Sequence, residues 1–117
     1  MSALLREITV LNLNQKIQAG EQFTILDVRE PWELKLAQIT DSRLVHLPMS
    51  QISQQLNEAF PETLRDQQTE IVVMCHHGVR SANVAIWMTQ NGWKNVSSLA
   101  GGIAAYAEEI DPSIGEY

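Results

Sequence analysis

The chain has 117 residues, which suits one domain and leaves no room for a second hydrophobic core. Hydrophobic residues make up 44% and charged residues 19%, which excludes intrinsic disorder, and no apolar run approaches the roughly 20 residues that a membrane helix needs. Eight basic against fourteen acidic side chains give a net charge of −6, which argues against binding to nucleic acid. We expect one domain over residues 1–117, with its core at about 7–110 and a short tail after it.

The ends of the chain and its cysteine content bear on where the protein works. The N-terminal segment, Met1 to Glu7, lacks a basic stretch followed by an apolar one, so we expect no signal peptide. Cys75 is the one cysteine, so no internal disulfide can form. A single thiol fits a reducing compartment, and we expect a cytoplasmic protein with no membrane contact.

Short β-branched runs alternate with helix-like stretches along the chain. Strands are predicted, in chain order, at Glu7–Val10, Phe23–Val28, Leu44–Leu47, Ile71–Cys75 and Val96–Leu99. Helices are predicted between and after them, at Leu11–Ala19, Pro31–Leu36, Met49–Phe60, Glu62–Gln67, Arg80–Asn91 and Gly102–Ile110. The second and fourth strands are almost continuously apolar, which is typical of parallel strands covered by helices on both faces. The pattern predicts an α/β fold with a mainly parallel sheet.

Polar residues follow the two most apolar strands, where open α/β sheets bind their ligands. One strand leads into Asp27-Val28-Arg29-Glu30, and the other into Cys75-His76-His77-Gly78-Val79-Arg80-Ser81. Gly78 lets the second segment turn with a positive φ. If this loop curls around Cys75, its amide groups and the start of the next helix point at the sulfur and stabilise an anion.

The size of this effect decides whether Cys75 is reactive. A free cysteine titrates near pH ~8.5, so only a few per cent is thiolate at neutral pH. Hydrogen bonds to a charged group contribute about 1.5–3 kcal/mol each, so two or three loop amides suffice to favour the thiolate. Arg80 and a protonated His76 or His77 can add to the effect. The sequence therefore predicts a reactive thiolate at Cys75.

The same residues allow other interpretations. A lone cysteine at the end of a strand is often a small buried hydrophobe, but the polar, basic loop that follows Cys75 argues against this. A metal site is disfavoured because the adjacent side chains of His76 and His77 point apart and the one other histidine is His46, so we expect neither a metal nor a cofactor. Gly101-Gly102 indicates a turn or a close approach of two backbones.

With these motifs in this order, the chain resembles the rhodanese-like sulfurtransferase family, and specifically its single-domain members. The resemblance covers nearly the whole chain. It rests on Ile25-Leu26-Asp27-Val28-Arg29-Glu30 with Glu33 on the next helix, Leu47-Pro48, the segment from Cys75 to Ser81, and Leu99-Ala100-Gly101-Gly102-Ile103. It implies a central, largely parallel five-stranded sheet flanked by helices.

The resemblance also implies a chemistry. The thiolate of Cys75 takes a sulfur from a donor such as thiosulfate, holds it as a persulfide, and passes it to an acceptor such as cyanide, a thiol or a protein. The loop from His76 to Ser81 holds the persulfide, and the Ser81 hydroxyl can donate to it. Arg80 and Arg29 are expected to bind an anionic donor or to brace the loop through Glu33, with Asp27 in support.

The chain departs from the family pattern in three places. The segment from Ala37 to Ser42 replaces a Gly-His-Ile-x-Gly-Ala motif, and we assign it no role. Ile103 stands where an aromatic residue is common. His76-His77 replaces the basic residues associated with good thiosulfate turnover, which counts against thiosulfate as the native donor.

Two further functions stay open at this point. A phosphatase or arsenate reductase on the same fold is disfavoured, because four residues separate Cys75 from Arg80 where the related phosphatases have five, and the shorter loop makes a cradle for one sulfur atom rather than a phosphate. A sulfur carrier is compatible with the same residues, because a persulfide on Cys75 can be delivered to a protein.

Overall fold

The computed structural model describes residues 5–117. The N-terminal segment in which we expect no signal peptide, Met1 to Glu7, lies mostly outside this range. Within it, one sheet of five strands runs in the order β1-β5-β4-β2-β3, and all four strand pairs are parallel. The strands are β1 (Glu7–Ile8), β2 (Thr24–Asp27), β3 (Leu44–His46), β4 (Ile71–Met74) and β5 (Val96–Leu99). The predicted α/β fold with a parallel five-stranded sheet is confirmed.

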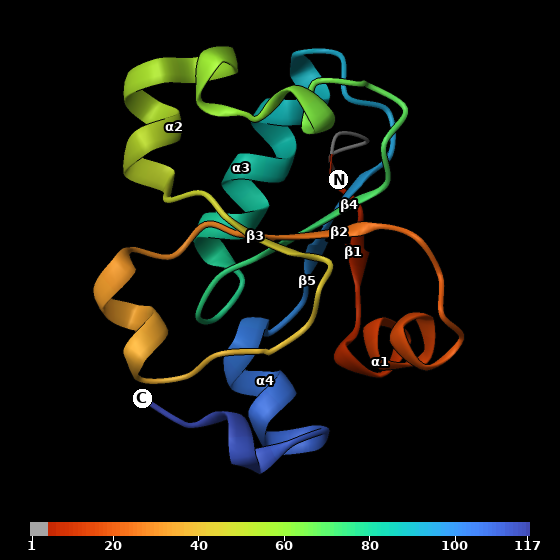
Figure 1. Cartoon of the computed structure of the whole chain (residues 1–117), viewed down its shortest axis with the longest axis vertical. Helices are drawn as coiled ribbons and strands as arrows, with labels where there is room; N and C mark the ends of the chain where they lie inside the picture. Colours follow the sequence, from red (N-terminus) through yellow and green to blue (C-terminus); the bar gives the residue numbers. More distant parts are fainter. Residues whose placement is uncertain (1–4) are drawn as a thin grey trace.

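Helices cover both faces of this sheet. Figure 1 shows α2 and α3 on one side of it and α1 and α4 on the other. The α-helices are α1 (Val10–Gln18), α2 (Met49–Gln55), α3 (Val79–Gln90) and α4 (Gly102–Glu109). Short 3₁₀ helices are η1 (Pro31–Lys35), η2 (Leu56–Ala59), η3 (Glu62–Leu64) and η4 (Pro112–Ile114). None of the helices within residues 5–117 has both the length and the apolar character needed to cross a membrane.

The central strand β4 shows why the sequence is apolar without interruption. Ile71 and Val73 pack in the cluster on the α2–α3 side, whereas Val72 and Met74 pack in the cluster on the α1–α4 side. All four side chains are at most 1% exposed. Both faces of the strand are therefore buried, as the pattern predicted, and the strand delivers Cys75 directly beyond its carboxyl end.

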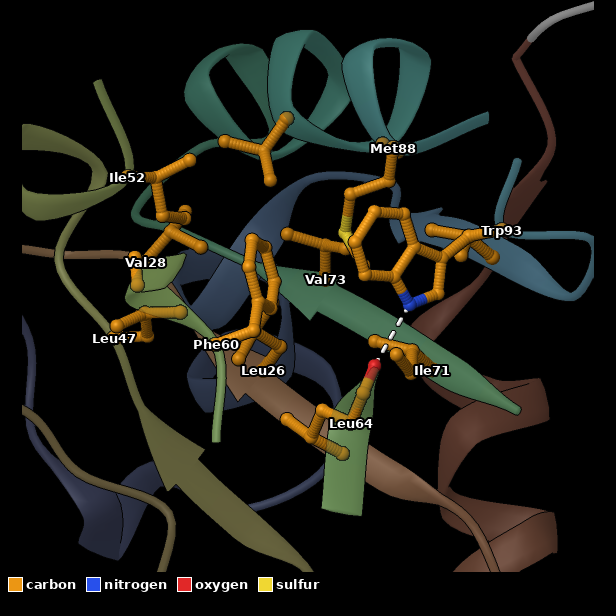
Figure 2. Packing of buried hydrophobic residues seen from close by; sticks show 14 of the residues in the cluster. Leu26, Val28, Leu47, Ile52, Phe60, Leu64, Ile71, Val73, Met88 and Trp93 are labelled. Carbon is orange, nitrogen blue, oxygen red and sulfur yellow. Dashed lines mark hydrogen bonds between the residues drawn. The ribbon is translucent and has the colours of Figure 1, made fainter. Parts of the chain in front are cut away.

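Aromatic side chains anchor the segment between α2 and β4 to the core. The rings of Phe60 and Trp93 lie 5.1 Å apart in a tilted arrangement, and the Trp93 indole N–H donates to the Leu64 carbonyl over 2.8 Å (Figure 2). An aromatic pair of this kind contributes about 0.5–1.5 kcal/mol beyond its buried area. The contacts tie η3 to the turn that follows α3.

The predicted helix over Met49–Phe60 is wrong in its length. α2 ends at Gln55, and Leu56, the first residue of η2, takes a positive φ of 54°. This change of direction leaves Leu56 exposed and turns Phe60 into the core. Hydrophobic periodicity gave no sign of the break, because Leu56 is apolar although it points to solvent.

Candidate active site

The loop after β4 curls around the sulfur of Cys75. The backbone amide of Gly78 donates to Sγ over 3.1 Å, and the amide of Ser81, in the first turn of α3, donates over 3.3 Å. Gly78 has a φ of 100°, so the positive φ that the sequence suggested is present. Both amides are directed at the sulfur, as expected for a loop that curls around Cys75.

Cys75 is also buried, with 1% of its surface exposed, and it contacts the core cluster on the α2–α3 side. The thiol is free. Burial alone would make this a structural cysteine, but a hydrocarbon environment supplies no donors, and here two amides are directed at the sulfur. The site combines a dry surrounding with fixed dipoles, which strengthens the electrostatic interaction of each amide with an anion.

The start of α4 holds the other side of this loop. The amides of Ile103 and Ala104 donate to the carbonyls of Cys75 and His76 over 2.9 and 3.0 Å. A Cβ atom on Gly102 would lie 2.5 Å from the Cys75 carbonyl oxygen and still closer to that of His76. The glycine pair therefore serves the close backbone approach that was one of its two predicted roles, and Gly101 also caps α4.

Two buried hydroxyls extend the polar contacts of the sulfur. Ser81 Oγ lies 3.4 Å from Cys75 Sγ and 2.7 Å from Ser98 Oγ on β5. Both serines are fully buried. Ser81 was expected here, whereas Ser98 was not; Ser97 beside it is also a serine, so the sequence does not single out Ser98.

Arg80 pairs with the Glu33 carboxylate, which is one of the two arrangements expected of it. Its guanidinium donates to both carboxylate oxygens of Glu33 over 2.6 and 2.7 Å. Glu33 is 2% exposed and also accepts from the Glu30 amide. The hydrogen bonds from Arg80 lower the pKa of Glu33 to about 2 against the opposing effect of burial, and the same contact raises the pKa of Arg80. Glu33 is thus an anion whose charge is matched by Arg80.

Asp27 and Arg29 form a fully buried ion pair. Arg29 donates to Asp27 through Nε over 3.0 Å and through Nη2 over 2.8 Å, and its Nη1 donates to the Ala37 carbonyl over 2.8 Å. Neither side chain is exposed. The expectation that Arg29 binds an anionic donor is wrong, because the guanidinium cannot be reached and its charge is already paired. Its role is to brace, and Ala37 in the divergent segment supplies one of its acceptors.

The two loop histidines have different surroundings. His77 is exposed, whereas the ring of His76 lies between the ring of His77 and that of Tyr117, with centroids 3.8 and 3.7 Å away. Burial lowers the pKa of His76 below its ordinary value, and His77 lowers it further. A protonated His76 therefore does not supply positive charge to the sulfur at neutral pH. Within residues 5–117, no three His, Cys, Asp or Glu side chains gather where they could hold a metal ion.

The chain is similar in sequence to known proteins of one family. Residues 9–109 match the family described as the rhodanese-like domain. The chain belongs to the rhodanese-like domain family. It is 34% identical to the "Putative sulfurtransferase YtwF" of Bacillus subtilis, over 92% of this chain and 96% of that protein. It is 33% identical to the "Putative sulfur carrier protein YrkF" of the same organism, over 83% of this chain but only 48% of the relative.

A solved structure agrees with the fold. The rhodanese-related protein of Thermoplasma volcanium superposes with a TM-score of 0.71 at 30% identity, over 90% of this chain and 93% of that one.

The rhodanese-like match ends at residue 109, so Tyr117 lies beyond it. Tyr117 was missed at the sequence level, since nothing in the residues around it indicates that the chain returns to the site.

Proposed function

We propose that this rhodanese-like protein is a sulfurtransferase that carries sulfur on Cys75. The observation that supports this best is the pair of amides, from Gly78 and Ser81, that donate to Sγ. A cradle of one loop and one helix start fits a single sulfur anion. The names of the relatives support the reaction class, and the geometry of this chain supplies the residues.

The proposed reaction has two steps. The Cys75 thiolate attacks the outer sulfur of a sulfane donor; with thiosulfate, the new S–S bond forms as the old one breaks, and sulfite leaves with its electron pair. The terminal sulfur of the persulfide is then attacked by an acceptor nucleophile, and Cys75 leaves as the thiolate. With cyanide the product is thiocyanate. The amides of the loop stabilise the anion in both steps, as an oxyanion hole stabilises oxygen.

The charges around Cys75 bear on the donor. Arg80 is paired with Glu33, and the lowered pKa of His76 leaves that ring neutral at pH 7. The positive potential at the sulfur therefore comes mainly from backbone dipoles, which attract a dianion less strongly than free cations do. We propose that thiosulfate loads Cys75 slowly and that low-charge persulfides of thiols load it faster.

The experiment is sulfur loading followed by intact mass spectrometry. The protein is incubated with thiosulfate or with a thiol persulfide, and the gain of one sulfur atom is measured, with thiocyanate formation after cyanide addition. We expect loading of the wild type and none of Cys75→Ser, which is nearly isosteric. Loading of Cys75→Ser, or no loading of the wild type by either donor, would contradict the proposal.

A carrier role is the second candidate, supported by the relative whose name describes a sulfur carrier. The same assay separates the two. An enzyme forms many equivalents of thiocyanate per Cys75, whereas a carrier forms a stable persulfide and releases about one equivalent to a small acceptor. A protein acceptor would then be the physiological partner.

A further inference from the structure

Tyr117 joins three parts of the site that are far apart in the sequence. Its hydroxyl donates to Glu33 Oε1 over 2.9 Å and accepts from Arg29 Nη1 over 3.2 Å. Its ring stacks on His76 with 7° between the planes. One side chain thus contacts the buried ion pair at the end of β2, the carboxylate of η1 and the loop after β4.

The backbone leads Tyr117 to this position in a defined way. The Gln38 amide donates to the Ile114 carbonyl over 3.0 Å, which fastens the segment 111–117 alongside residues 36–38. A Cβ atom on Gly115 would overlap the Leu36 carbonyl, so the chain passes close to that backbone. The segment also borders a hollow of about 490 Å³, lined by residues that include His76, Glu108 and Glu116. The segment is thus held against residues 36–38 and also lines the hollow beside His76.

The consequence concerns the loop around Cys75. His76 directly follows Cys75, and its Nε2 atom is inaccessible to solvent without a hydrogen-bond partner. The His76 ring is therefore oriented by its ring contacts, stacked on Tyr117 and tilted against His77. A loop whose first residue is fixed presents its amides to the sulfur without further ordering, and such preorganisation strengthens the stabilisation of charge.

We propose that Tyr117 is a positioning residue for the chemistry of Cys75: its ring fixes His76, its hydroxyl fixes Glu33, and together they hold the loop closed around the sulfur. This rests on the proposed function for its role in sulfur transfer. The contacts themselves predict effects on thiol reactivity that do not depend on any donor.

Two substitutions separate the ring from the hydroxyl. Tyr117→Phe keeps the stack and removes the hydrogen bonds to Glu33 and Arg29. Tyr117→Leu keeps apolar bulk and removes both contacts. Ser113→Ala is the matched control, because its hydroxyl lies in the same segment and bonds Asp111 rather than the site. Thermal unfolding of each variant confirms that the protein is folded at the assay temperature.

The first readout is the rate of Cys75 alkylation by iodoacetamide at pH 7, which is unambiguous because the chain has one cysteine. We expect a loss of about tenfold for Tyr117→Leu and about threefold for Tyr117→Phe, the size of one or two hydrogen-bond equivalents. Ser113→Ala should match the wild type. An alkylation rate for Tyr117→Leu within twofold of the wild type would overturn the proposal.

The second readout is the NMR titration of the His76 ring, which a merely structural role would not move. The charged and titratable groups around this ring are His77, Arg80, Glu33, Glu108 and Glu116. Because these stay in place, Tyr117→Leu should move the His76 midpoint up toward its ordinary value, whereas Tyr117→Phe should not. If both readouts shift as expected but no donor loads sulfur, the proposed function fails and the role of Tyr117 stands.

Discussion

The hydroxyl oxygens of Ser81 and Ser98 lie 2.7 Å apart, and that of Ser81 lies 3.4 Å from the sulfur of Cys75. A hydroxyl both donates and accepts, so the hydrogen bonds of this pair can reverse direction when the sulfur changes its charge. A protonated thiol donates to Ser81. Once the thiol ionises, Ser81 can turn its proton to the sulfur while Ser98 donates to Ser81, which adds a third donor to the two amides.

Ser81→Ala should therefore slow the reaction of Cys75. A hydrogen bond to a charged group contributes about 1.5–3 kcal/mol, so we expect alkylation at pH 7 to fall by about tenfold or more. Ser98→Ala should cost about threefold, because it acts on the sulfur only through Ser81. The rate of iodoacetamide alkylation against pH measures both.

The control for this prediction lies next to Ser98. Ser97→Ala removes a hydroxyl from the adjacent position of β5, whose side chain points to the opposite face of the sheet, and should leave the rate unchanged. The double variant Ser81→Ala/Ser98→Ala should be no slower than Ser81→Ala alone. Additive effects would show that Ser98 acts by some other route.

The pair of Glu33 with Arg80 predicts how stability depends on pH. The pKa of Glu33 is lowered from 4.5 to about 2 by the Arg80 hydrogen bonds, so this carboxylate binds fewer protons in the folded state than in the unfolded state. Its contribution to the free energy of unfolding is complete above pH 4.5 and declines as the pH falls toward about 2. Glu33→Gln should lower stability at pH 7 by about 2–3 kcal/mol, as expected for hydrogen bonds to a charged group.

The measurement is urea unfolding of the wild type and Glu33→Gln between pH 7 and pH 2. The difference in the free energy of unfolding between the two proteins should shrink as the pH falls. The wild type then loses the contribution of the ionised Glu33, which the variant lacks at every pH. Glu109→Gln, at an exposed position of α4, is the control and should track the wild type. A constant difference across the whole pH range would show that Glu33 keeps an ordinary pKa.

The sequence predicted the sheet and the cradle because their signals are local. Uninterrupted apolar runs such as 71–74 report burial on both faces, and a glycine three residues after Cys75 reports the turn of the loop. Both follow from backbone chemistry within a few residues. The brace between Arg80 and Glu33 came from the family resemblance, since the two residues are 47 positions apart.

The features of the site that the sequence did not predict come from segments that are distant in the chain and meet only in the fold. Ser98 and Tyr117 reach the site through the order of the strands and the path after α4, which no local pattern encodes. For Arg29 the family resemblance left two roles open, binding an anionic donor or bracing the loop. Its complete burial is set by Ala37 and Tyr117, which close over it from later in the chain.

Gly102→Ala should damage both the fold and the site. The residue has a φ of 62°, and an added Cβ would collide with the carbonyls of Cys75 and His76. Left-handed strain and overpacking together predict a loss of about 3–5 kcal/mol and roughly tenfold or slower sulfur loading. Gly20→Ala separates the two causes, because Gly20 has a φ of 71° but nothing within 4 Å of the added atom. That variant should lose only about 1–2 kcal/mol in urea unfolding, with unchanged loading; equal losses for the two variants would mean that the contact with the loop is unimportant.

Arg29 and Arg43 form the same kind of ion pair at different degrees of burial, so they test how burial changes the stability that an ion pair contributes. Each arginine pairs with an aspartate two residues earlier, but Arg29 and Asp27 are 0% exposed, whereas Arg43 and Asp41 are 20% and 14% exposed. Arg29→Ala leaves the Asp27 carboxylate buried without its partner and should cost about 3–5 kcal/mol. Arg43→Ala leaves Asp41 in contact with water and should cost about 1 kcal/mol. Urea unfolding at pH 7 measures both, and Arg29→Ala should also lose sulfur loading as Glu33 and Tyr117 shift. Similar losses for the two arginines would show that the buried pair does not brace the site.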